Sequence, residues 1–235
     1  MTLPTTGRGV RIAVIDSGVH PGHDHINSSL LLPGAAIAGD GTIDTGPEAT
    51  LDRMGHGTAV TAAIQEKAPD ASCIPVRVFH DALKTTGYAL ITAIDWAAGQ
   101  GADIINLSLG STNPAHAPAF AAAVERARDA GSIVVAPYAV EETPCYPGAC
   151  EGVLSVRLDW DCPRETFRAA TDGSGHFSAS GLPRPIPGVP QRRNIHGISF
   201  ATAQMSGFAA RALETLGTAA NCKNRIDALR AALRA

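Results

Sequence analysis

The chain has 235 residues, of which 45% are hydrophobic, 17% are charged and 5% are aromatic. That length can bury one sizeable core, so it predicts a single domain over residues 1–235. The formal net charge is −3, and no long basic run is present. Binding to nucleic acid through its phosphates and electrostatic docking on a membrane are both disfavoured as functions.

The N-terminal segment MTLPTTGRG lacks the apolar core of a signal peptide, and no apolar run approaches the roughly 18 residues that span a bilayer. These observations predict a soluble, cytoplasmic protein. The five cysteines fit neither a zinc quartet nor a complete disulfide framework, and they are Cys73, Cys145, Cys150, Cys162 and Cys222. Cys145 and Cys150 could pair locally, but reduced thiols are expected without an export signal.

Short β-branched runs alternate with alanine-rich amphipathic stretches, which is typical of parallel βαβ units. Strands are expected, in chain order, over residues 11–16, 73–79, 102–110, 132–136 and 152–158. Helices are expected over residues 87–98, 115–130 and 199–216. Four prolines in residues 182–190 predict a surface loop. The fold class is therefore α/β, with a mostly parallel central sheet flanked by helices.

Ligands of such sheets bind beyond the carboxyl ends of the strands, where Asp16 is expected. Three segments carry polar residues between apolar or glycine neighbours: Ile12–Val19, Gly55–Val60 and Gly197–Ala203. Alone, each has an ordinary interpretation as a strand-end turn, a flexible loop or a helix N-cap. Together and in this order, they resemble the three active-site signatures of the subtilisin-like serine proteases, the subtilases of peptidase family S8.

The resemblance covers roughly residues 9–216 and implies a three-layer, subtilisin-like fold. Matched residue by residue, it implies a catalytic triad of Asp16, His56 and Ser199. A serine hydroxyl is a poor nucleophile until a histidine accepts its proton, and the imidazole needs a carboxylate to fix its tautomer. Ser199 at a helix N-terminus also places a backbone N–H where an oxyanion develops.

The resemblance further implies how a substrate is held. The segment Ile105–Gly110 is similar to the family segment that forms one wall of the primary specificity pocket, so Ser108, Leu109 and Gly110 are expected to bind substrate. Leu83–Thr85 falls where the opposite edge strand lies in the family. Such binding through the backbone implies a polypeptide or peptide substrate. No cofactor is expected, and no metal, because the calcium loops of many relatives are not recognisable in this chain. The charge balance disfavours a nucleic-acid or membrane partner, and the oligomeric state is left open.

The chain departs from the family pattern beside the expected nucleophile. An ungapped match puts Val140 where the family has an asparagine that is the second donor of the oxyanion hole, and valine cannot donate. A shifted loop could offer the Tyr138 hydroxyl, a protonated Glu141 or a backbone N–H instead. Ile198 stands where the family often has Thr. Ala203-Gln204 stands where it usually has Pro-His.

Two further groups of residues have competing interpretations. Glu141 and Glu142 fall near the expected rim of the primary pocket, where they would favour a basic residue before the scissile bond, or they simply face solvent. The segment His20–His25 contains three histidines. The family has a similar turn after its aspartate strand, so we expect no metal there.

The leading hypothesis is a serine endopeptidase, and analogy with compact members of the family suggests that it processes a dedicated peptide or precursor substrate. The alternative is a catalytically impaired subtilase fold that binds a peptide, and Val140 motivates it. An esterase of the α/β-hydrolase class is disfavoured, because Gly197–Ala201 lacks the second glycine of the Gly-x-Ser-x-Gly elbow and the triad order differs.

Overall fold

A computed structural model describes residues 5–217 and 224–235. Its main sheet has nine described strands, in the spatial order β10 (Phe167–Ala169), β11 (Phe177–Ala179), β9 (Leu154–Leu158), β6 (Ile133–Pro137), β5 (Ile104–Leu107), β1 (Arg11–Asp16), β4 (Ser72–Arg77), β2 (Ala35–Ile37) and β3 (Ile43–Asp44). The pairs from β11 to β2 are parallel, and the two outermost pairs, β10–β11 and β2–β3, are antiparallel. The expected, mostly parallel sheet is therefore confirmed.

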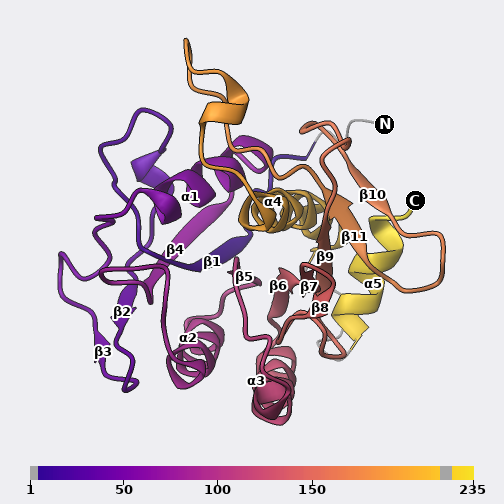
Figure 1. The fold of residues 1–235 in the computed structure, drawn as a ribbon, viewed down its shortest axis with the longest axis horizontal. Helices are drawn as coiled ribbons and strands as arrows, with labels where there is room; N and C mark the ends of the chain where they lie inside the picture. Colours follow the sequence, from indigo (N-terminus) through magenta and orange to yellow (C-terminus); the bar gives the residue numbers. More distant parts are fainter. Residues whose placement is uncertain (1–4, 218–223) are drawn as a thin grey trace.

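Helices cover both faces of this sheet, which gives three layers (Figure 1). One face carries α1 (His56–Lys67), α4 (Ile198–Leu216) and α5 (Arg225–Ala232), and the other carries α2 (Gly87–Gly99) and α3 (Ala117–Asp129). Short 3-10 turns cover residues 28–30, 114–116 and 191–193. A two-stranded hairpin, β7 (Ala139–Val140) with β8 (Thr143–Pro144), follows β6. None of the described helices is long and apolar enough to cross a membrane.

The central strand β1 shows why the sheet is buried on both faces. Successive side chains of a strand point to opposite faces. Ile12 and Val14 belong to the apolar cluster shared with α1, α4 and α5. Ala13 and Ile15 belong to the cluster shared with α2 and α3. A nearly continuous apolar run is what a parallel strand covered on both faces requires, and it ends at Asp16 on the carboxyl edge.

The structure shortens the strand expected over residues 102–110 and adds a C-terminal helix, α5. The strand expected over residues 102–110 ends at Leu107, and the chain continues past it without a partner in the main sheet. Helix α5 was not expected from the sequence. It docks through fully buried Leu229, and Arg225 donates to Asp103 at 2.7 Å. Residues 182–190 form an irregular loop, as expected.

The expectation of an edge strand at Leu83–Thr85 is wrong. These residues form no strand and precede α2 as irregular chain, with 49% of Leu83 exposed. An extended segment outside the sheet has no backbone partner of its own, and its pairing with a substrate stays a prediction.

Candidate active site

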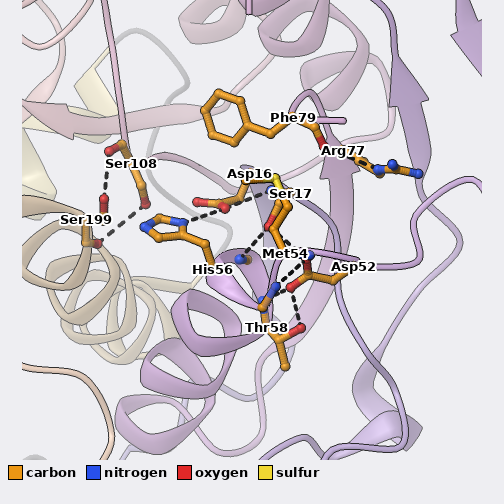
Figure 2. A network of polar contacts seen from close by, with 12 residues as sticks. Asp16, Ser17, Asp52, Met54, His56, Thr58, Arg77, Phe79, Ser108 and Ser199 are labelled. Atoms are coloured by element: carbon orange, nitrogen blue, oxygen red, sulfur yellow. Dashed lines mark hydrogen bonds and ion pairs between the residues drawn. The ribbon is translucent and has the colours of Figure 1, made fainter. Parts of the chain in front are cut away.

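Asp16 is the last residue of β1, and its side chain is fully buried at the carboxyl edge of the sheet. Its Oδ1 accepts hydrogen bonds from the Ser17 backbone N–H at 2.7 Å and from His56 Nδ1 at 2.7 Å. A carboxylate only accepts, so Nδ1 carries the proton and Nε2 is left as the basic nitrogen. Figure 2 shows the imidazole lying between Asp16 and Ser199. The structure thus brings these three residues together, as the sequence predicted.

Close contact between α1 and the turn after β1 brings His56 next to Asp16. His56 is the first residue of α1, and Gly57 lies directly against the backbone of Gly18. A Cβ on Gly57 would lie 2.3 Å from the Gly18 carbonyl oxygen, so only glycine permits this approach. The Gly57 N–H donates to Ser17 Oγ at 2.8 Å, which ties the helix to the residue that follows Asp16.

A second buried carboxylate, Asp52, holds the first turn of α1. Its Oδ1 accepts from Ser17 Oγ (2.9 Å), Met54 N (2.8 Å) and Gly55 N (2.9 Å). Its Oδ2 accepts from the N–H (2.9 Å) and the hydroxyl (2.6 Å) of Thr58 (Figure 2). Burial raises the pKa of Asp52, but the hydrogen bonds from Thr58, Met54 and Gly55 outweigh burial and hold that pKa below its ordinary value.

Asp52 was not among the residues predicted from the sequence, although its position just before a helix indicates a role. A carboxylate just before a helix is a common partner for the free N–H groups of the first turn. Asp52 precedes α1 by four residues in Asp52-Arg-Met-Gly-His56. This position predicts only contacts with the start of the helix. It does not predict the hydrogen bond between Asp52 and Ser17, the residue that follows Asp16.

The pKa of His56 is raised above its ordinary value. Burial alone would lower it, because the charged imidazolium loses hydration. The hydrogen bond from His56 to Asp16, the charge of Asp16 and the charge of Asp52 together outweigh burial. His56 therefore holds a proton to a higher pH than a free histidine does.

Ser199 is the second residue of α4, and its hydroxyl donates to the Ser108 carbonyl at 3.2 Å. A hydroxyl carries one proton, so that proton must turn away from the Ser108 carbonyl before any donation to His56. The aromatic ring of Phe200, the next residue, lies 5.9 Å from the imidazole, centroid to centroid. Ser199 is thus beside His56 but is hydrogen-bonded elsewhere in this resting arrangement.

The segment Ser108–Gly110 leaves β5 in the direction of Ser199. Ser108 Oγ accepts from Asn106 at 2.9 Å, and Asn106 in turn accepts from Ser206 of α4 at 2.9 Å. Ser108 is buried, whereas Leu109 and Gly110 are half-buried. A Cβ on Gly110 would lie 2.6 Å from the Sγ of Cys145, so this thiol directly backs the segment.

Val140 ends β7 in a hairpin whose two turn residues, Glu141 and Glu142, have φ values of 47° and 65°. Val140 and Ile198 line one cavity of about 630 Å³, so Val140 does lie beside the segment that carries Ser199. Neither side chain can donate a hydrogen bond. Val140 is 42% exposed.

The Tyr138 ring is held by two neighbours. It lies 3.8 Å from the His176 ring, centroid to centroid, and 4.7 Å from Cζ of Arg157. Among the described residues, no side-chain hydrogen bond links Tyr138 or Glu141 to Ser199.

The other departure from the family pattern, Gln204, is buried in α4. Its amide nitrogen donates to the carbonyls of Ser180 (2.7 Å) and Leu182 (3.2 Å). Gln204 thereby fixes the start of the proline-rich loop over residues 182–190.

The cysteines and the histidine-rich turn offer no second reactive centre in the part of the chain that is described. Cys145 and Cys150 are both free thiols, as are Cys73 and Cys162. Burial raises the pKa of Cys73 to about 12 and that of Cys145 to about 11, so these thiols stay protonated at neutral pH. Across residues 5–217 and 224–235, no three His, Cys, Asp or Glu side chains converge as metal ligands. Cys222 lies outside the described residues.

The fold and this site define a protease of the subtilisin type, and comparison with known proteins agrees. The model of the subtilase family matches residues 7–233, so the chain belongs to that family. Subtilisin DY of Bacillus licheniformis is 26% identical, over 94% of this chain and 83% of its own length. Thermitase of Thermoactinomyces vulgaris is 28% identical, over 94% and 81%. The solved structure of sphericase superposes with a TM-score of 0.74 at 25% identity, covering 98% of this chain and 84% of that one. The chain is a subtilisin-like serine protease.

We predict that the His56 imidazole titrates above its ordinary pKa of about 6.5 and that Asp52→Asn lowers this pKa. Asp16→Asn should lower it further, because Asp16 contributes both a hydrogen bond and a charge. The measurement is an NMR titration of the His56 ring protons. Because the pKa of His56 is raised in the folded state, protonation of His56 stabilises the fold. This contribution to the free energy of unfolding is fully present below the unfolded-state pKa and is lost as the pH rises through the folded-state pKa. An unchanged titration in Asp52→Asn would show that the Asp52 charge does not reach the imidazole.

Proposed function

We propose that this protein is a serine endopeptidase in which Ser199 is the nucleophile, His56 the general base and then acid, and Asp16 the residue that orients the imidazole. The observation that carries the proposal is the 2.7 Å hydrogen bond from His56 Nδ1 to buried Asp16, with Ser199 on the other side of the ring. This bond leaves Nε2 free to accept a proton. The substrate is a polypeptide or peptide.

The reaction begins when the Ser199 hydroxyl turns from the Ser108 carbonyl to His56 Nε2. As the Ser199 oxygen attacks the peptide carbonyl carbon, its proton passes to Nε2, the carbon becomes tetrahedral and its oxygen takes the negative charge, while the C–N bond stays intact until the next step. The intermediate collapses, His56 gives that proton to the leaving amine, and the acyl group stays on Ser199. Water, deprotonated by His56, then attacks the acyl carbon and releases the second product with Ser199 regenerated.

The backbone N–H of Ser199 supplies one donor for the oxyanion. Gly197 precedes α4, so the Ser199 N–H belongs to the first turn, which has no partner within the helix. Val140 and Ile198 supply no side-chain donor. Loss of one such donor in a relative of this family costs about 10²–10³ in turnover. Slow turnover suits an enzyme that processes one dedicated peptide or precursor, and we propose that role.

The substrate runs along Ser108, Leu109 and Gly110, and the side chain before the scissile bond lies toward Glu141 and Glu142. Those two carboxylates would favour a basic residue at that position. A peptide library cleaved only after large apolar residues would contradict this preference. The cytoplasmic location stays a prediction from the sequence.

A fluorophosphonate probe should label Ser199 covalently, since the probe reports an activated serine hydroxyl. Ser199→Ala and His56→Ala should each lower kcat for peptide hydrolysis about 10⁴-fold or more. Labelled residues are identified by mass spectrometry, and Ser29→Ala, at an exposed serine in a 3-10 turn, is the matched control. No labelling, together with peptide binding that His56→Ala leaves unchanged, would instead establish the catalytically impaired peptide-binding protein.

Gly57→Ala should lower kcat/KM about 10²-fold while the protein stays folded. The added methyl group would meet the Gly18 carbonyl at 2.3 Å and push His56 away from Asp16, and a displacement of about 1 Å costs this much. Gly99→Ala is the matched control, because nothing lies within 4 Å of its added Cβ at the end of α2. Circular dichroism checks folding. Wild-type kcat/KM in Gly57→Ala would show that the α1 contact does not position His56.

Val140→Asn should raise kcat by up to about 10²-fold with little change in KM, because it offers a side-chain donor to the oxyanion. Val140→Leu, which offers no donor, should leave kcat near the wild-type value. Both are measured by steady-state hydrolysis of one peptide. Equal rates in the two variants would mean that the hairpin does not aim residue 140 at the oxyanion.

A further inference from the structure

A cavity of about 320 Å³ lies against the first turns of α1, and the proposed mechanism does not use it. Its walls come from the turn after β1, from the chain before and within α1, and from the proline-rich loop. The basic groups among its lining residues are His20, His23, His25, Arg53 and Arg184. Five side chains that carry or can accept positive charge thus meet around one hollow.

The two arginines have no acidic partner. Within the described chain, neither Arg53 nor Arg184 forms an ion pair. Arg184 Nη1 donates to the His25 carbonyl at 3.0 Å, which holds the loop against the turn after β1. The pKa of His25 is lowered, first by burial and then by the charges of Arg184 and His23, while the charges of Asp24 and Glu66 act in the opposite direction.

The carboxylates near the cavity offset only part of its positive charge. Asp52 lines it and contributes one negative charge, against the two guanidinium groups of Arg53 and Arg184, and both of its oxygens already accept hydrogen bonds from Ser17 and from the first turn of α1. Glu66 is paired with Arg164 and with Lys67. Asp24 is exposed on the turn between His23 and His25. The cavity therefore presents uncompensated donors, and neutral imidazoles donate through one N–H as well.

The position of the cavity relates it to the reaction. Gly55, next to His56, lines it, and so do Asn194 and Ile195, a few residues before Ser199. No residue of 108–110 or 138–142 lines it. The cavity thus shares no lining residue with the segment Ser108–Gly110, which is proposed to hold the acyl part of the substrate. His56 protonates the leaving amine, so the chain that follows the cleaved bond departs past His56.

We propose that this cavity is a subsite for an acidic side chain, Asp or Glu, in the substrate segment that follows the scissile bond. The inference rests on the proposed function and extends it to the leaving-group side of the substrate. Ile186 and Ile195 add apolar surface at the cavity wall, against which the methylene groups of such a side chain pack. A carboxylate pairs with guanidinium groups through charge-assisted hydrogen bonds.

The test uses a library of short peptides with randomised sequences in two assays. In the first, the active protein cleaves the library, and the residues that follow each cleaved bond are identified by mass spectrometry. In the second, immobilised Ser199→Ala retains peptides, which are then sequenced. Both assays are repeated in an Arg53→Gln and an Arg184→Gln background. Arg184→Lys keeps the charge, and Arg8→Gln changes an exposed arginine that precedes β1, at the opposite end of that strand from Asp16.

We expect Asp and Glu to be enriched after the cleaved bond and among the retained peptides. Loss of one exposed charge pair lowers an affinity about two- to five-fold, so each Gln variant should reduce the enrichment of Asp and Glu by that factor. Arg184→Lys and Arg8→Gln should keep it, and added salt should weaken it. Equal use of Asp, Glu, Asn and Gln, or enrichment that survives in the Arg53→Gln/Arg184→Gln double variant, overturns the subsite. Absence of cleavage alongside acidic enrichment on Ser199→Ala would overturn the proposed function and leave the subsite supported.

Discussion

The contact between the first turn of α1 and the turn that follows β1 is the constraint on which the site depends. Asp16 sits on a strand buried on both faces, so its position is set by the sheet. His56 belongs to a helix and meets Asp16 only if that helix approaches the strand end closely. The missing Cβ of Gly57 permits the approach, and Ser17, which donates to Asp52 and accepts from Gly57, holds it. Buried carboxylates are costly unless hydrogen-bonded, and five hydrogen bonds to Asp52 meet that cost.

This arrangement orients the imidazole, but other features of the site would slow the proposed reaction. The Ser199 proton is engaged by the Ser108 carbonyl, so the nucleophile exchanges one hydrogen bond for another before it reacts. The raised pKa of His56 reduces the share of neutral base in mildly acidic solution. Val140 and Ile198 leave the oxyanion without a side-chain donor. In the proposed mechanism each of these features would lower the rate, and none of them disturbs the Asp16–His56 pair.

The sequence predicted those parts of the fold and site that local patterns specify. The strand over residues 11–16 was placed with its observed bounds, because an apolar run between turn signals has one interpretation in an α/β chain. The candidate triad came from glycine-flanked signatures whose order is informative. Asp52 was missed because its importance lies in contacts made through Ser17 across the fold. Helix α5 was missed because its weakly amphipathic sequence, RIDALRAA, becomes a helix through packing on α4 and the sheet.

In the proposed binding mode, the charged groups around the site would fix the direction in which a substrate binds. Glu141 and Glu142 stand on the turn of the hairpin after β6, whereas the arginines and histidines stand around the cavity beside α1. The two groups come from different loops and line different hollows. A peptide with a basic residue before the bond and an acidic one after it would pair with both groups, and the reversed sequence would meet like charge at each end. Because like charges disfavour the wrong register as strongly as opposite charges favour the right one, such an arrangement selects a single cleavage site rather than a high rate.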